Sequence, residues 1–97
     1  MSKVLLDSTI VRSSDQVSTD LGGEAVILSL QSQEYFGLED VGARIWDIIQ
    51  EPKTVQEILN AVLNDYAVEP KRCERDLLAV LQQLADEGLI EVTMVKL

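Results

Sequence analysis

Near residue 39 the spacing of apolar residues changes along this 97-residue chain. Before that point, residues 17–21 alternate apolar and polar side chains, and residues 24–30 and 33–38 are rich in β-branched, aromatic and large apolar residues. Such patterns are typical of strands. From residue 39 to residue 86, apolar residues recur at spacings of three and four, the period of a helix. The pattern predicts an α+β fold in which strands precede helices.

Turn signals divide the first part into three strands. Two adjacent glycines, Gly22 and Gly23, predict a two-residue hairpin, and residues 31–32 predict a second tight turn. The strands at 17–21, 24–30 and 33–38 then form an antiparallel meander, with residues 24–30 as the central strand. One face of that strand carries Val26, Leu28 and Leu30.

Three helices are predicted, at residues 39–50, 54–66 and 70–86. Thr54 and Glu57 form a capping box at the start of the second helix, and Pro70 is a favoured first residue for the third. Residues 89–95 could return as a strand, and residues 4–6 and 9–11 could be short strands or arms. We therefore expect one α+β domain over residues 1–97, with a three-stranded antiparallel sheet followed by three helices on one face.

Composition excludes several classes of function. The sequence has no histidine, which removes catalysis by a serine or cysteine with a His base, and His-ligated zinc. Its single cysteine, Cys73, cannot form an internal disulfide or a Cys-based metal site. The formal net charge of −9 repels phosphate backbones and anionic membranes. We expect no catalytic residue, no metal, no cofactor, no nucleic-acid partner and no membrane partner.

Three features favour a cytoplasmic location. A lone unpaired thiol fits a reducing compartment. The N-terminal apolar run of residues 4–6 is too short for a signal peptide, and it ends at Asp7. No window approaches the roughly 20 apolar residues of a membrane span.

Two further patterns indicate a surface for an extended peptide. The strand at 33–38 comes last in the meander and has no Pro or Lys to block its edge. The third helix has a second apolar stripe, of Cys73, Leu77 and Val80 with Asp76 beside it, in addition to its core stripe. Neighbouring helices could cover this second stripe. Alternatively, it could line a groove in which an added strand is read by its side chains.

The order of these elements resembles the PqqD-like family over residues 17–92. The residues that carry the resemblance are Ala25 to Leu28, Gln33 to Leu38, Gly42 to Trp46, Thr54 to Ile58, Asp65, Tyr66, Asp76, Leu84 and Gly88 to Ile90. The chain departs from the family pattern at Glu39, where Asn is usual, and at Gly37, which lies between the aromatic residues and Leu38.

This resemblance implies a winged-helix-like fold that recognises peptides rather than DNA. Such domains bind the leader segment of a ribosomally made precursor peptide and present it to modifying enzymes. The chain looks most like the stand-alone leader-binding partner of lasso-peptide biosynthesis, which works with a transglutaminase-like leader peptidase. By analogy, the leader backbone would pair with Gln33, Glu34, Tyr35, Phe36 and Gly37. Its side chains would contact Cys73, Asp76, Leu77 and Val80.

Three other functions stay open on the sequence. One is a winged-helix DNA-binding regulator, although acidic residues separate Lys71, Arg72 and Arg75 on the third helix, where a DNA reader needs a basic footprint. Another is a PqqD-like chaperone of a different peptide-modifying pathway, such as a radical-SAM system. The third is an acyl-type carrier, for which the only Asp-Ser pair, Asp7 and Ser8, is poorly placed.

Overall fold

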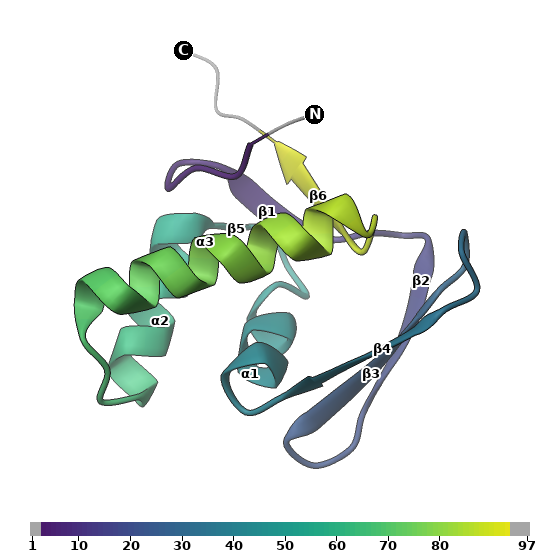
Figure 1. The fold of residues 1–97 in the computed structure, drawn as a ribbon, viewed down its shortest axis with the longest axis horizontal. Coiled ribbons are helices and arrows are strands. Elements are labelled where there is room, and N and C mark those ends of the chain that lie inside the picture. Colours follow the sequence, from purple (N-terminus) through teal and green to yellow (C-terminus); the bar gives the residue numbers. More distant parts are fainter. Residues whose placement is uncertain (1–2, 94–97) are drawn as a thin grey trace.

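The computed structural model describes residues 3–93, which form three helices and two small antiparallel sheets (Figure 1). The α+β prediction is confirmed. One sheet has the strand order β2-β3-β4 and the other has the order β5-β1-β6. The elements are β1 Thr9–Arg12, β2 Gln16–Asp20, β3 Glu24–Ser29, β4 Tyr35–Glu39, α1 Val41–Ile48, β5 Lys53–Thr54, α2 Val55–Asp65, α3 Pro70–Asp86 and β6 Ile90–Thr93.

The predicted meander is the β2-β3-β4 sheet. Gly22 and Gly23 form the turn between β2 and β3 with φ values of 64° and 92°, which glycine adopts without steric cost. On β3, the face carrying Ala25 and Ile27 is buried. The face predicted from Val26, Leu28 and Leu30 is the opposite one, away from the core, and Leu30 lies just beyond the strand.

Strand β4 begins at Tyr35, two residues later than predicted. Gln33 has a φ of 60°, and its N–H donates to the Ser29 carbonyl at 2.8 Å. This turn geometry takes residues 33 and 34 out of the strand. The ladder between β3 and β4 then runs from Leu28 opposite Tyr35 to Glu24 opposite Glu39.

Helix α1 is shorter than the predicted 39–50. Glu39 is the last residue of β4, and Asp40 takes a φ of 52° in the turn that follows. The helix therefore starts at Val41, and the first two residues of the predicted range, Glu39 and Asp40, belong to the strand and the turn. The other two helices start within one residue of their predicted positions. The predicted capping box of α2 is present: the Thr54 hydroxyl accepts from the Glu57 N–H at 3.1 Å, and the Glu57 carboxylate accepts from the Thr54 N–H at 2.9 Å.

The second sheet joins the two ends of the described chain. β1 pairs with β6 over Thr9–Arg12 and with the two-residue β5. The sequence indicates possible strands at residues 9–11 and 89–95, but no local pattern in it predicts that they pair. The expected strand at 89–95 is present as Ile90–Thr93, and residues 94 and 95 lie outside the described residues.

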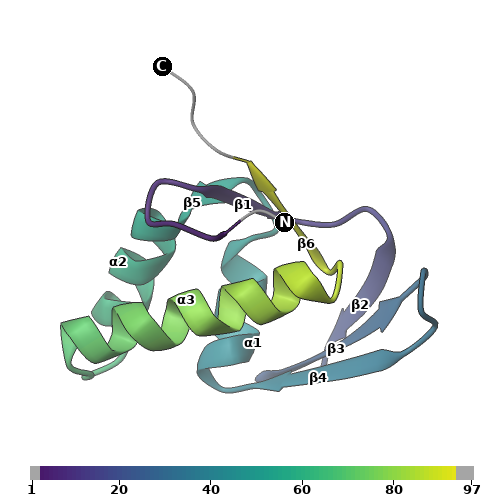
Figure 2. The same ribbon diagram turned by 45° about the horizontal axis from the view of Figure 1, so that its top comes forward.

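The core lies between the helices and the inner faces of both sheets. Figures 1 and 2 show α1 between α3 and the β2-β3-β4 sheet, with the β5-β1-β6 sheet above α3 in both views. Within residues 3–93, no helix is long and apolar enough to cross a membrane. The fully buried large side chains are Ile10, Ile27, Ile49, Ile58, Leu81, Leu89, Val55 and Val62.

Candidate functional site

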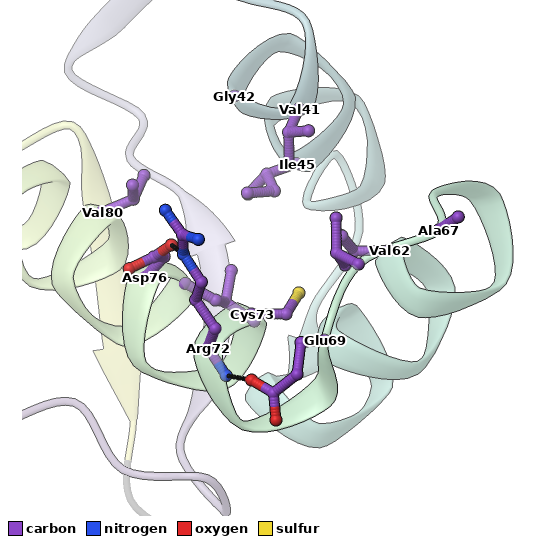
Figure 3. A pocket seen from close by; sticks show the side chains of 12 residues that line it. Val41, Gly42, Ile45, Val62, Ala67, Glu69, Arg72, Cys73, Asp76 and Val80 are labelled. Atoms are coloured by element: carbon purple, nitrogen blue, oxygen red, sulfur yellow. Dashed lines mark hydrogen bonds and ion pairs between the residues drawn. The ribbon is translucent and has the colours of Figure 1, made fainter.

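A groove of about 560 Å³ opens between α1 and the first half of α3 (Figure 3). Side chains from α1, α2, the α2–α3 loop and α3 surround it, and most of them are apolar. A hollow of this size that is lined mainly by apolar groups is typical of a ligand site. The lining residues are Val41, Gly42, Ile45, Val62, Ala67, Val68, Glu69, Arg72, Cys73, Asp76, Leu77 and Val80.

The four site residues predicted on the third helix all line this groove. Cys73, Asp76, Leu77 and Val80 follow one another at helical spacing, so one face of α3 presents them to α1. Leu77 is also part of the core and is only 3% exposed, whereas Cys73 and Val80 are half-buried. The second apolar stripe of α3 is thus not fully covered by neighbouring helices.

Charged groups stand at the mouth of the groove. Arg72 Nε lies 3.9 Å from Asp76 Oδ2, and both side chains are largely exposed. The Glu69 carboxylate accepts from the Arg72 backbone N–H at 2.7 Å and so caps the start of α3. Exposed ion pairs contribute little to stability, so these side chains are free to reorient toward a ligand.

Cys73 forms part of the apolar wall. Burial, and to a lesser extent the Asp76 carboxylate, raise the pKa of its thiol above the usual value. The thiol therefore stays protonated at neutral pH, and a protonated thiol behaves as a small apolar group. Within residues 3–93, no three His, Cys, Asp or Glu side chains lie close enough together to hold a metal ion.

Alternate residues of β4 direct their backbone N–H and C=O groups toward β3 or toward the open edge of the sheet. The Ser29 N–H donates to the Glu34 carbonyl at 2.9 Å, which places this pair among the hydrogen-bonded pairs of the ladder. Bonded and non-bonded pairs alternate along antiparallel strands, so the next bonded pair is Ile27 with Phe36. The backbone groups of Phe36 thus face β3, and those of Tyr35, Gly37 and Glu39 face the open edge.

The structure separates the five predicted strand residues into three groups. Gln33 and Glu34 lie in the turn before β4. Tyr35 and Gly37 present their backbone to the edge, whereas Phe36 directs its backbone to β3 and packs its ring against the core. None of the five is among the residues that line the groove.

The edge and the groove nevertheless adjoin. β4 ends at Glu39, α1 begins at Val41, and both Val41 and Gly42 line the groove. Gly42 also packs on the preceding strand, because a Cβ at this position would lie 3.5 Å from the Leu38 side chain. In Figure 2, β4 forms the outer edge of its sheet, and the chain passes from it directly into α1.

The sequence did not identify the α1, α2 and loop residues of the groove. Val41 and Ile45 are apolar positions of the predicted first helix, and their spacing of four is equally suited to a core stripe. Val62 is buried and belongs to both the core and the groove floor. Only the arrangement of α1 and α3 on α2 shows which apolar residues border an open space.

Comparison with known proteins places this fold in a family. The profile for "Coenzyme PQQ synthesis protein D (PqqD)" matches residues 24–90. The solved structure of TbiB1 in complex with the TbiA(beta) leader peptide is 41% identical, with a TM-score of 0.79, and the match covers 84% of this chain and 94% of that one.

A lasso peptide synthetase B1 complexed with the leader peptide has the same fold, at 22% identity and a TM-score of 0.74. That match covers 84% of this chain and 96% of the other. No curated protein matches the sequence significantly. The family profile covers more than half of the chain, and the resemblance drawn from the sequence is confirmed: this protein belongs to the PqqD family.

Proposed function

We propose that this protein is a non-catalytic adaptor that binds the leader segment of a ribosomally made precursor peptide and presents it to a processing enzyme. One observation carries the proposal: an unblocked strand edge at β4 adjoins an open apolar groove on α3. The 41% identity to TbiB1, a protein solved with a leader peptide, supports the same conclusion.

Binding would begin with the backbone. An extended leader that pairs with β4 would exchange hydrogen bonds with the outward N–H and C=O groups of Tyr35, Gly37 and Glu39. These bonds do not depend on side chains, so they provide affinity for many sequences. Gly37 has no heavy atom within 4 Å of the position that a Cβ would take, so the outer face of β4 is open at this residue.

Specificity would come from the groove. An apolar leader side chain that leaves the added strand near Asp40 would meet Val41 and Ile45 on one side and Val80 on the other (Figure 3). Burying such a side chain contributes roughly 1.5–3 kcal/mol. Asp76 would add to binding where the leader brings a Lys, an Arg or a backbone donor to the mouth of the groove.

Presentation, rather than chemistry, would be the contribution to maturation. The chain has no histidine, so we expect no peptide cleavage by the purified protein alone. A transglutaminase-like leader peptidase is the proposed partner, and it would gain efficiency because its substrate arrives positioned. The reducing cytoplasm, expected from the single thiol, is the proposed site of this work.

The groove does not favour the DNA-binding alternative. Arg72 is the only cation among the residues that line it, and the acids Glu69 and Asp76 flank this cation. A surface that neutralises phosphates needs several clustered cations.

The test is a titration of the full-length protein into a fluorescently labelled leader peptide, followed by anisotropy. A scrambled peptide of the same composition is the control. We expect saturable binding of the leader and weaker binding of the scrambled peptide. Equal binding of both peptides, or no binding of either, would exclude a leader-binding adaptor.

A further inference from the structure

The outer face of the β2-β3-β4 sheet, which points away from the helices, is unusually apolar. In an antiparallel sheet with one buried face, the other face is normally polar. Here Val17, Leu28 and Tyr35 stand directly opposite one another across the three strands. Val17 is 56% exposed and Tyr35 is 72% exposed, so no described element covers this row.

The apolar surface extends beyond this row. Val26 lies on the same face of β3 and is only half-buried. Leu21 at the β2–β3 turn and Leu30 at the end of β3 are 60% and 50% exposed. Four of the six exposed large hydrophobic residues of residues 3–93 thus lie on this sheet or at its ends. A contiguous patch of this kind marks an interaction site more often than isolated exposed residues do.

The same region is strongly acidic. Residues 13–43 contain no Lys or Arg. Glu24 and Glu39 are direct cross-strand partners on the outer face, an arrangement that destabilises a sheet unless a cation neutralises it. The acidic residues of this segment are Asp15, Asp20, Glu24, Glu34, Glu39 and Asp40.

We propose that this outer face docks the enzyme that receives the presented peptide, through a surface on that enzyme that is apolar and basic. The inference rests on the proposed adaptor function. Charge decides the class of occupant: two copies of this acidic face repel each other, whereas a basic protein surface is attracted to it. The apolar row would supply the buried centre of the contact, and Glu24 and Glu39 would belong to its charged rim.

The position of the face explains why docking and leader binding would act together. A leader strand added to β4 becomes a fourth strand of the same sheet, and its alternate side chains extend the same outer face. Tyr35 stands on β4 and would lie beside them. An enzyme seated on this face would contact adaptor and leader at once, so it would bind the loaded adaptor more tightly than the empty one.

The experiment measures the affinity of the purified transglutaminase-like leader peptidase for the full-length protein loaded with the leader. Val17→Asp places a charge in the apolar row on β2, the strand farthest from the leader. Leu5→Asp is the matched control, since Leu5 is an exposed leucine (41%) outside this sheet. We expect Val17→Asp to weaken peptidase binding by about tenfold or more, Leu5→Asp to leave it unchanged, and both variants to bind the leader normally.

A second pair of variants guards against loss of folding. Val17→Thr keeps the β-branched shape and replaces one methyl group with a polar hydroxyl, so it should weaken peptidase binding in the same direction in a folded protein. Glu24→Lys should slow association and reduce its dependence on salt, because the charge attraction is partly removed.

Two results would overturn the docking face. One is peptidase affinity within twofold of wild type for Val17→Asp, Val17→Thr and Glu24→Lys together. The other is self-association of the wild-type protein in sedimentation that Val17→Asp abolishes, because the face would then join two copies of this chain. If the wild-type protein does not bind the leader, the proposed adaptor function itself is wrong, whatever the peptidase results.

Discussion

The two edges of the β2-β3-β4 sheet each adjoin a hollow beside α1, and the two hollows are opposite in character. The groove next to β4 is apolar, has a volume of about 560 Å³ and has charges only at its mouth. The hollow next to β2 has a volume of about 210 Å³ and is lined mainly by polar groups, among them Ser18, Asp20 and Asp47. Both adjoin strand edges of similar length, so the edge alone does not define a binding site.

Arg12 forms part of the wall of the polar hollow. Its guanidinium lies 4.6 Å from the centre of the Trp46 ring and donates to the Trp46 carbonyl from Nε at 2.9 Å and from Nη2 at 2.7 Å. These bonds satisfy a carbonyl near the end of α1 that has no partner within the helix. The groove beside β4 is larger and mainly apolar, which is why that groove is the candidate binding site.

Proline substitutions in the two edge strands, β4 and β2, should give the largest difference in leader affinity. Gly37→Pro removes an outward N–H from β4 and leaves the bonds to β3 in place, so leader affinity should fall on the order of a hundredfold. Ser18→Pro is the matched control, since the Ser18 N–H also points outward, from the edge of β2. The Leu21 N–H donates to the Glu24 carbonyl at 2.8 Å, so Leu21 faces β3. Bonded and non-bonded residues alternate along the strand, so Ser18, three residues earlier, faces the open edge.

Anisotropy titration measures this contrast, and circular dichroism checks that both variants are folded. If Gly37→Pro is folded and binds the leader like wild type, the leader does not add to β4. If Ser18→Pro loses binding as well, the effect belongs to the whole sheet and not to one edge.

A charge in each hollow gives the next largest contrast. Val80→Asp puts a carboxylate where an apolar leader side chain docks, and an unpaired desolvated charge should weaken binding more than tenfold. Gln50→Glu changes the charge in the polar hollow and should leave leader affinity unchanged. Titration and thermal melting are measured on both.

Thermal stability decides what the Val80 result means. Because Val80 is half-buried, we expect binding to fall far more than the melting temperature does. If Val80→Asp unfolds the protein, Val80 belongs to the core and the docking residue lies elsewhere. If the variant is folded and binds the leader normally, α3 is not the surface that reads the leader.

Removing Arg12 should affect stability and not binding. Arg12→Ala deletes two charge-assisted hydrogen bonds to the Trp46 carbonyl and the contact with its ring, which should lower the free energy of unfolding by about 1–3 kcal/mol. Urea denaturation measures this change, and Arg12→Lys should recover part of it. A loss of leader affinity in folded Arg12→Ala would show that the two hollows are coupled.

Cys73 alkylation is the smallest expected effect. The raised pKa of its thiol leaves less thiolate near pH 8, so iodoacetamide should modify Cys73 more slowly in the folded protein than in urea. The rate should rise with pH, and the leader should slow it further by covering the groove. Mass spectrometry follows the modification, and equal rates with leader and with scrambled peptide would place the leader outside the groove.

The raised pKa of the Cys73 thiol also makes the stability of the folded protein depend on pH. The folded protein favours the protonated thiol, so the stability that Cys73 contributes is present below the thiol's usual pKa. It is lost as the pH rises through the raised value, and neutral pH lies in the stable range.

The features that could be predicted from the sequence depend on local interactions. The capping box of Thr54 and Glu57 and the fixed φ of Pro70 set the starts of α2 and α3 within a few residues, and the paired glycines at 22 and 23 set a hairpin. The ordered motifs also identified the PqqD family, and helical spacing predicted the second apolar stripe of α3, whose residues line the groove.

Contacts between distant segments were decided only by the tertiary structure. β1 pairs with β6 across some 80 residues, and no local pattern in either strand specifies that partner. Burial chose which face of β3 points inward, and the turn at Asp40 set where β4 ends and α1 begins. The groove exists only because α1 and α3 both pack against α2 and leave a space between them. Its α1 wall of Val41 and Ile45 could not be read from a helical period that serves a core equally well.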